Sequence, residues 1–499
     1  MDTMYHHSSL LRALPGTRPM AYAPAAAALA VLLALGGCAS QGPAHTAAAQ
    51  LDATALGLAS TAGPSATDAA QLPPAHWWTA LGDTQLDALI AQALAGSPSL
   101  AASQARFDKA MALASASSTA TDVHGTFSAD ATRQRYSANG LVPPPVAGHT
   151  YSSSNVQAGL SWSPDFFGRH AAELQAALGQ ARAAQADSAA AANVLAAQIA
   201  QSYVALARLL AQRDIAQQTL IQRQSLLNLS QQRTQAGLDS QVELTQAQAG
   251  LPEARTQIEM LDEQITLARR TIAVLSAQEP NAQASLKPQL SQLQVQAVPQ
   301  VLGADLLGRR ADVVAARWRI EAASSDINTA KADFYPDINL TAFVGLSALG
   351  FDNIFKGSSR QLGVTPALRL PIFDGKRLRA QLRGKQADLD TAIAQYNALV
   401  LDAVKQSGDA IASVQSLGRQ QSLQAESLRK AEQAYSFAVQ RYKAGLATQI
   451  TVLNTETQVI AQRRLAVDLK ARELDTRISL MKALGGGWQD NTASTGLSS

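Results

Sequence analysis

The chain has 499 residues, of which 47% are hydrophobic and 16% charged, with 41 lysines and arginines against 38 aspartates and glutamates. This length suits two or three ordinary domains or one elongated structure. The single cysteine excludes a disulfide framework and any zinc or iron–sulfur site built on several thiolates, because these need thiolates in pairs or fours. A net charge of +3 and an aromatic content of 5% show no bias towards nucleic acid as a partner.

The sequence shows none of the catalytic or phosphate-binding motifs considered below. The seven histidines end at His170, so nearly two thirds of the chain has no imidazole. No Gly-x-Ser-x-Gly motif occurs, and glycines 485–487 lack the downstream Lys-Ser/Thr of a phosphate-binding loop. We therefore expect a protein that is not an enzyme and that has no catalytic residue, no metal site and no cofactor.

Residues 1–37 have the features of a secretory signal peptide. Two arginines precede an apolar run at 21–35, and two glycines and the single cysteine, Cys38, follow it. The run of 15 residues is short for a membrane-spanning helix, which needs about 20. The cysteine alone is compatible with a chance position near an ordinary signal or with a buried structural role. Residues 38–74 are rich in small residues and proline, which predicts a flexible tether.

An internal duplication organises the remaining chain. Residues 232–238 match residues 440–446 at an offset of 208 positions, and residues 166–169 loosely match residues 372–376. A period this long indicates two copies of a half-domain rather than a solenoid. The first repeat is expected at 75–280, and the second, with a C-terminal tail, at 281–499.

Each repeat contains a predicted pair of β-strands with alternating apolar and polar residues. The strands are expected at about 122–132 and 155–164, and at about 337–345 and 361–371. Such alternation places one face in an apolar medium and the other in water, and a soluble sheet packed on helices shows the same pattern. In a bilayer the sheet edges must be closed, and membrane barrels begin at about eight strands. A membrane sheet would therefore require an oligomer, with eight strands from two chains or twelve from three.

Each repeat also contains two long predicted helices. They are expected at about 168–235 and 240–279, and at about 375–443 and 448–484. The apolar residues of these segments follow the helical period, and a helix of 68 residues is about 100 Å long. Pro252 predicts a kink or local unwinding, because proline removes a hydrogen bond and clashes with the preceding turn.

Several motifs are shared with a known family. They are Trp77-Trp78 with Asp83 and Leu86, Leu160-Ser161-Trp162 with Phe166-Phe167-Gly168-Arg169, Ala304-Asp305-Leu306-Leu307 with Arg309-Arg310 and Asp312, Phe334-Tyr335-Pro336, Leu370-Pro371-Ile372-Phe373-Asp374-Gly375, and Lys482-Ala483-Leu484-Gly485. With these motifs the chain resembles the outer-membrane factors of tripartite efflux systems, the TolC-like channels, and within them the NodT-type lipoproteins. The resemblance implies a mainly α fold with membrane β-strands, in which a trimeric 12-stranded β-barrel continues into a 12-helix α-barrel.

The resemblance also implies a function, a location and partners. The chain would be a channel subunit of a tripartite efflux system of the resistance-nodulation-division type, forming a passive exit duct for drugs or other small solutes. Its partners would be a periplasmic adaptor, an inner-membrane pump, outer-membrane lipid and two further copies of itself. The alternatives are an outer component for protein secretion or heavy-metal export, and a lipid-tethered periplasmic coiled-coil protein.

The segment around Cys38 resembles a bacterial lipobox. This resemblance implies cleavage before Cys38 and attachment of a diacylglycerol and an N-acyl chain to that residue. Ala39 follows the cysteine where lipoproteins retained at the inner membrane carry aspartate. The implied location is therefore the outer membrane, both lipid-anchored and spanning, with a tunnel in the periplasm.

The turns between paired helices are the candidate functional positions. By the resemblance, 233–244 and 441–453 would form periplasmic tips that meet the adaptor and close the channel. The candidate residues are Arg233, Gly237, Asp239, Arg441, Tyr442, Gly445, Thr451 and Asn454. Arg441 and Tyr442 are expected to hold the closed tip through contacts between protomers. Asp239 and Glu243 are read more simply as charges at a helix start, and Thr451 and Asn454 stand where relatives often carry acidic residues.

Overall fold

The structure is a computed structural model that describes residue 41 and residues 45–51, 74–294 and 309–488. The signal peptide, Cys38 and most of the predicted tether lie outside these residues. The chain forms two compact units, and each unit takes segments from both repeats. The first unit includes Ala120–His170 and Ile327–Lys385, and the second includes Thr46–Thr119, Ala171–Asp326 and Gln386–Ser499.

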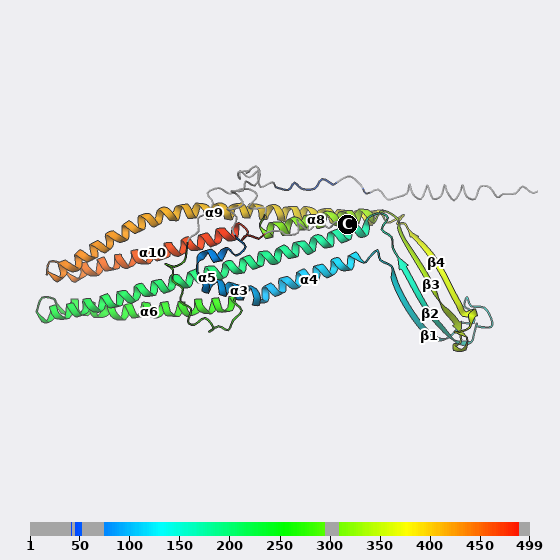
Figure 1. Cartoon of the computed structure of the whole chain (residues 1–499), viewed down its shortest axis with the longest axis horizontal. Helices are drawn as coiled ribbons and strands as arrows, with labels where there is room; N and C mark the ends of the chain where they lie inside the picture. Colours follow the sequence, from blue (N-terminus) through cyan, green and yellow to red (C-terminus); the bar gives the residue numbers. More distant parts are fainter. Residues whose placement is uncertain (1–40, 42–44, 52–73, 295–308, 489–499) are drawn as a thin grey trace, which may run out of the picture. The chain divides into compact units, whose positions relative to one another are not determined.

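The first unit contains a four-stranded antiparallel sheet in the order β1-β2-β3-β4 (Figure 1). Its strands are β1 (His124–Arg135), β2 (Thr150–Trp162), β3 (Asp337–Leu349) and β4 (Arg360–Arg369). Short 3-10 turns, η3 (Phe351–Asn353) and η4 (Gly357–Ser359), lie between β3 and β4. The strands lie where the alternating pattern predicts them, and three of them extend further at their loop ends.

One face of the sheet is apolar across all four strands. The register sets Phe127 opposite Ala158, Ala158 opposite Val344, and Val344 opposite Leu362. Large apolar side chains on this face are between 54% and 80% exposed: Phe127, Leu160, Val344, Leu362, Val364 and Leu368. A soluble sheet would cover such a face with helices, so the exposed side chains favour the membrane alternative.

The opposite face of the sheet is mainly polar, with Phe343 and Leu349 of β3 as its large apolar residues. Asn155 donates a hydrogen bond to Asp130 at 3.2 Å and accepts one from Gln361 at 2.8 Å. These bonds link side chains of β1, β2 and β4 across the sheet, because Gly345 of β3 lies beside them without a side chain. The two faces therefore differ in polarity as the period-two pattern predicts.

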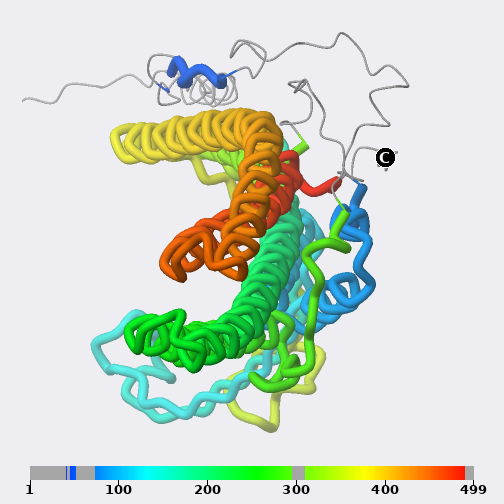
Figure 2. The backbone as a smooth tube through the Cα atoms, turned by 90° about the vertical axis from the view of Figure 1, so that its left-hand side faces the viewer, coloured from blue at the N-terminus to red at the C-terminus, as the bar shows by residue number. Residues whose placement is uncertain are grey.

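Two helical hairpins correspond to the two repeats. The first pairs α5 (Arg169–Gln235) with α6 (Gln241–Leu275), and the second pairs α9 (Gly375–Lys443) with α10 (Gln449–Ala483). Their lengths are 67 and 35 residues in the first hairpin and 69 and 35 in the second. Figure 2 views the turn ends of the hairpins and shows the helices along a curve. The remaining helices are η2 (Trp77–Leu81), α3 (Thr84–Gly96), α4 (Pro98–Ser118) and α8 (Ala311–Ala332).

The expected local unwinding at Pro252 is not found. Helix α6 runs without interruption from Gln241 to Leu275 and includes Pro252. Arg223 of α5 donates a hydrogen bond at 3.0 Å to the carbonyl of Gly250, in the turn that precedes the proline. This bond lies two residues before the proline, whereas the carbonyl that loses its helical donor at Pro252 is that of Gln248.

The largest apolar core of the second unit joins η2, α3, α5, α6 and α10. Tyr203 of α5 is fully buried there, and its hydroxyl donates to the carboxylate of Asp83 at 2.7 Å. The same carboxylate accepts from the backbone N–H of Gln85 and so caps α3. Helix α5 includes a stretch long and apolar enough to cross a membrane, but more than half of that stretch is buried, so core packing accounts for it.

Part of the predicted tether is bonded to helix α9. The backbone N–H groups of Ala48 and Leu51 donate to the side-chain oxygens of Asp390 and Asn397 at 3.1 and 2.8 Å. The amide of Asn397 also donates to the carbonyl of Ala49 at 3.0 Å. We call residues 45–51 the N-terminal strap. The expectation of a flexible tether at 38–74 is therefore wrong for this part.

Candidate functional site

The two helix turns predicted as tips have the same backbone geometry. Gly237 and Gly445 have φ angles of 70° and 74°, in the left-handed region that favours glycine. Leu238 donates to the carbonyl of Arg233, and Leu446 donates to that of Arg441, both at 2.8 Å. Together with the bonds from the two glycines at 3.0 Å, these are Schellman motifs that end α5 and α9.

The starts of the following helices differ between the two repeats. Ser240 and Glu243 form a capping box, in which the hydroxyl of Ser240 accepts from Val242 N–H and Glu243 accepts from Ser240 N–H. Thr448 occupies the equivalent position before α10, but its side chain makes no capping bond. Its hydroxyl lies 3.2 Å from that of Thr451. The sequence-based interpretation of Glu243 as a helix-start charge is confirmed.

Asp239 of the first turn is bound by residues of two helices. The guanidinium of Arg233 donates to both carboxylate oxygens of Asp239, each at 3.0 Å. The hydroxyl of Tyr442, at the end of α9, donates to the same carboxylate at 2.6 Å. The Arg233 guanidinium also lies over the Tyr442 ring at 4.7 Å and donates to the Tyr442 carbonyl at 3.3 Å. These three residues, here called the tip triad, join the two hairpins.

The tip triad is largely removed from solvent. Tyr442 is 1% exposed, and the side chains of Arg233 and Asp239 are 14% and 9% exposed. The hydrogen bonds from Arg233 hold the pKa of Asp239 below its usual value, and the bond from Tyr442 acts in the same direction. Burial, followed by the bond to Asp239, raises the pKa of Tyr442 to about 12. Near neutral pH the triad therefore contains a carboxylate, a guanidinium and a neutral phenol.

Two sequence-based expectations about this site need correction. Tyr442 was expected to bond between protomers, but its hydroxyl is used within one chain and its ring is buried there. Asp239 was interpreted as a helix-start charge, but Ser240 and Glu243 cap the helix, and Asp239 bonds to Arg233 and Tyr442 instead.

The remaining candidate residues stay outside the tip triad. Arg441 is exposed, and its guanidinium donates at 3.3 Å to the carbonyl of Leu446 in its own turn. Thr451 and Asn454 are exposed on α10. The structure thus brings three of the eight candidate positions together through side chains, while Gly237 and Gly445 shape the turns.

A second charged cluster, which the sequence analysis missed, joins α5, α6 and α10. Arg223 lies between Glu253 at 2.5 Å and Glu456 at 3.3 Å. Glu456 is 1% exposed, and burial raises its pKa. Its position could have revealed it, because it follows Val452 by four residues and precedes Val459 by three, on the buried face of the helix.

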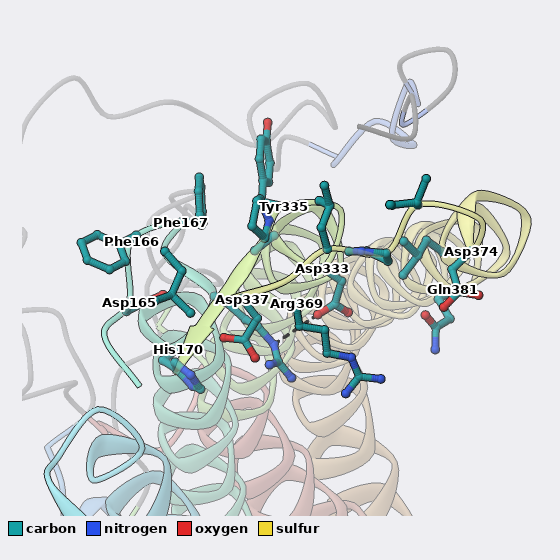
Figure 3. Close-up of a pocket in the computed structure, with 18 of the residues that line it drawn as sticks. Asp165, Phe166, Phe167, His170, Asp333, Tyr335, Asp337, Arg369, Asp374 and Gln381 are labelled. Carbon is teal, nitrogen blue, oxygen red and sulfur yellow. Dashed lines mark ion pairs between the residues drawn. The ribbon is translucent and has the colours of Figure 1, made fainter. Parts of the chain in front are cut away.

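A cavity of about 580 Å³ lies in the first unit, where the strands lead into the long helices. Figure 3 shows Asp333, Asp337 and Arg369 close together, with Phe166, Phe167 and Tyr335 to one side. The rings of Phe167 and Tyr335 stack at 5.2 Å, and both side chains are more than 40% exposed. Exposed aromatic residues at strand ends are typical of the membrane–water boundary of outer-membrane barrels.

The part of the chain that the structure describes contains no group of side chains suited to binding a metal ion. Within those ranges, no three His, Cys, Asp or Glu side chains are grouped so that they could hold a metal ion.

Comparisons with known proteins match both repeats. The family model described as "Outer membrane efflux protein" matches residues 89–278 and 302–486. The multidrug resistance outer membrane protein MdtQ of Escherichia coli O157:H7 is 33% identical over 426 residues, 84% of this chain and 89% of its own length. The multidrug resistance outer membrane protein MdtP of Shigella flexneri is 32% identical, over 84% and 87%.

A solved structure shows the same fold. The outer membrane protein VceC of Vibrio cholerae is 32% identical to this chain and superposes with a TM-score of 0.79, over 84% of this chain and all of that one. The expected fold class, with membrane β-strands and long helices in a duplicated unit, is thereby confirmed.

Proposed function

The chain belongs to the outer membrane efflux protein family, and from this premise we propose that three copies form a passive exit duct for drugs and other small solutes. The protein is a channel of the outer membrane that takes part in efflux. In the proposed assembly, twelve strands form one β-barrel in the membrane and twelve long helices form the tunnel in the periplasm.

One observation carries the proposal: the sheet has an exposed apolar face, a polar face and two edges. Within the described residues, β1 and β4 each pair with a single neighbour. A bilayer cannot satisfy open sheet edges, and four strands are too few to close on themselves. Three chains would give twelve strands, with the apolar face towards lipid and the polar face towards a water-filled lumen.

The proposed partners supply the energy source that a passive duct does not contain. The chain has no motif for nucleotide binding, so the energy for transport must come from another protein. We propose an inner-membrane pump of the resistance-nodulation-division type and a periplasmic adaptor that contacts the helix turns. The relatives MdtQ and MdtP are named as multidrug resistance proteins, which supports small organic molecules as the solutes.

Lipid attachment at Cys38 is part of the same proposal. The signal-like residues 1–37, the small residues before Cys38 and Ala39 after it support a diacylated and N-acylated mature N-terminus. Cys38→Ala is expected to abolish incorporation of labelled palmitate. Labelling of the variant at the level of the unaltered protein would contradict the assignment.

The channel is tested with the Cys38→Ala protein in membranes and planar bilayers. We expect it to leave the membrane only in detergent, to migrate as a trimer and to conduct ions as single channels. Release by a salt wash as a non-conducting protein would instead support the lipid-tethered coiled-coil alternative. Deleting the gene and measuring accumulation of drugs, organic acids and metal ions would identify the solutes, and increased accumulation of metal ions alone would support heavy-metal export.

We further propose that the tip triad restrains the closed tip. Tyr442→Phe removes the hydroxyl that joins α9 to Asp239 and should raise the open probability or conductance of single channels. Tyr435→Phe is the matched control, because Tyr435 packs against the same apolar cluster as Tyr442 and its hydroxyl takes no part in the triad. Equal open probability and equal conductance in the two variants and the unaltered protein would refute this role.

A further inference from the structure

The edge strands β1 and β4 are each free to pair with a strand of another chain along one side. We propose that β4 pairs antiparallel with β1 of a second copy of this chain, in a register that places Thr365 opposite Ser128 of the partner subunit. We call this junction the seam. The inference rests on the proposed trimeric barrel and adds the register, which the strand count does not specify.

The duplication relates the strands of the two repeats. Helix α5 begins at Arg169 and α9 begins at Gly375, an offset of 206 residues. Phe166-Phe167 and Ile372-Phe373 precede these starts at the same offset. Applied to the strands that lead into the helices, this offset makes Leu362 of β4 the equivalent of Val156 of β2.

The registers inside the chain extend this equivalence to the other strands. Val156 pairs with Ala129, and Leu362 pairs with Val344. Ala129 of β1 is therefore the equivalent of Val344 of β3. Because β2 and β3 form the junction from the first repeat to the second, the seam between β4 and the partner's β1 is the matching junction from the second repeat back to the first.

The register of the seam then follows from the register of β2 with β3. Ala158 pairs with Val344, and the equivalents of these residues are Val364 and Ala129. The seam therefore sets Val364 opposite the partner's Ala129, and one position along the strand it sets Thr365 opposite the partner's Ser128.

The seam satisfies the polarity of both strands. It places Leu362 opposite the partner's Ala131 and Val364 opposite the partner's Ala129 on the apolar face, and Gly363 opposite the partner's Asp130 on the polar face. Large and small residues are paired at each of these positions, as Gln157 is paired with Gly345 inside the chain. A slip of one residue would turn apolar side chains to the lumen, so only slips of two are compatible with the faces.

The register also gives a barrel of ordinary tilt. Ala129 pairs with Val156, Val156 with Leu346, and Leu346 with Arg360. The seam pairs Arg360 with the partner's Arg133. The path that starts at Ala129 therefore returns to β1 four residues further along, so the stagger of the barrel is four residues per chain and twelve for three chains. With about 3.3 Å per residue and about 4.8 Å between strands, the strands tilt by about 35°.

Tilt separates the proposed register from one neighbouring register and the duplication separates it from the other. Setting Thr365 opposite the partner's Thr126 would give a tilt of only about 19°, outside the usual range of about 35–45°. Setting it opposite the partner's Asp130 would give about 46°, at the upper end of that range, but would depart from the register that the duplication gives. The proposed seam brings Arg360 and Arg133 together at the loop end, where both are exposed. Such a like-charged pair costs little because solvent ions screen it.

The test is disulfide cross-linking in the Cys38→Ala background. Thr365→Cys is combined with Ser128→Cys, and the control pairs combine it with Thr126→Cys or Asp130→Cys. Directly opposed residues have Cα atoms about 4.5–5.5 Å apart, within reach of a disulfide, whereas diagonal neighbours are about 7–8 Å apart. Within one chain two strands separate β1 from β4, so a cross-link must join two copies.

We expect the Thr365–Ser128 pair to give a covalent trimer on denaturing gels without reductant, with at least tenfold less cross-linking in the control pairs. Preferred cross-linking to Thr126 or Asp130, or none with any pair, would overturn the seam register. The size of the Cys38→Ala protein in detergent separates this failure from failure of the proposed function. A trimer that cross-links elsewhere contradicts only the register, whereas a protein that is not trimeric contradicts the proposed channel.

Discussion

Asp239 lies in the exposed turn between α5 and α6, and its carboxylate accepts three hydrogen bonds. Two come from Arg233 of α5 and one comes from Tyr442 of α9. Its two donors differ in chemistry. Arg233 carries a fixed charge, whereas Tyr442 can lose its proton at high pH. A hydrogen bond to a charged group stabilises a protein by about 1.5–3 kcal/mol, so one of the contacts that link the hairpins depends on the protonation of the Tyr442 phenol.

The contribution of Tyr442 should depend on pH at the alkaline end. Because the pKa of Tyr442 is raised to about 12 in the folded protein, its stabilising effect is present below the ordinary tyrosine pKa near 10 and is lost as the pH rises through 12. We expect the difference in Tm between the unaltered protein and Tyr442→Phe to be constant from neutral pH to about pH 10 and then to fall. A difference that does not change up to pH 12 would contradict the phenol–carboxylate bond.

The starts of α6 and α10 are equivalent positions of the two repeats, so α10 can serve as a control for the helix cap of α6. Both long helices end in the same Schellman motif, but only α6 begins with a capping box. At the start of α10, Thr448 and Thr451 replace Ser240 and Glu243. The turn of the first repeat therefore has side-chain or backbone caps at both adjoining helix ends, whereas the turn of the second repeat has a cap only at the end of α9.

Ser240→Ala should destabilise the start of α6 by about 1 kcal/mol, because it removes the side-chain acceptor for a backbone N–H. Thr448→Ala should cost less than half as much, since the Thr448 side chain makes no capping bond. Hydrogen exchange in the first turns of α6 and α10 measures both effects. Equal acceleration in the two variants would show that the capping box adds nothing.

Arg223 links α5 to α6 and α10 in the interior of the helical unit. Arg223→Ala would leave Glu456 buried without its cation and should cost about 3–5 kcal/mol. Glu456→Gln removes the buried charge, while Arg223 keeps its ion pair with Glu253, so the expected loss is below about 1 kcal/mol. Denaturant unfolding compares the two, and an equal loss would contradict the model of a buried glutamate compensated by Arg223.

At the scale of the whole molecule, the N-terminal strap joins the beginning of the chain to α9. Ala48 follows Cys38 by ten residues, a reach of at most about 36 Å. The next residue of the described chain after the strap is Pro74. Fixing the strap on α9 therefore leaves ten residues, rather than more than thirty, between the proposed lipid and the first attachment to the protein.

Asn397→Ala removes the hydrogen bonds that join the strap to α9 at Leu51 and Ala49. We expect faster hydrogen exchange at Leu51 and faster proteolysis of residues 45–51, with little change in the Tm of the protein, because the strap contributes no residue to the large apolar core. Gln395→Ala, an exposed change on the same helix, is the control. Unchanged exchange at Leu51 would refute the strap.

Local sequence patterns predict the helices and strands and their duplication. Period-two alternation and helical periodicity are local properties, so they located four strands and four long helices without knowledge of their partners. The turns at Gly237 and Gly445 could also be predicted, because both residues have positive φ angles and glycine adopts such angles without steric cost. The apolar and polar faces of the sheet followed from the same alternation.

Which polar side chains meet depends on the packing of the helices. Asp239 and Tyr442 are 203 positions apart, and nothing local distinguishes a carboxylate that caps its helix from one that binds an arginine and a phenol. The same holds for Arg223 with Glu456 and for the strap on Asn397. Helical periodicity shows which residues of a helix are buried, whereas the pairing of buried polar groups depends on how neighbouring helices are placed against one another, and that relation is not local.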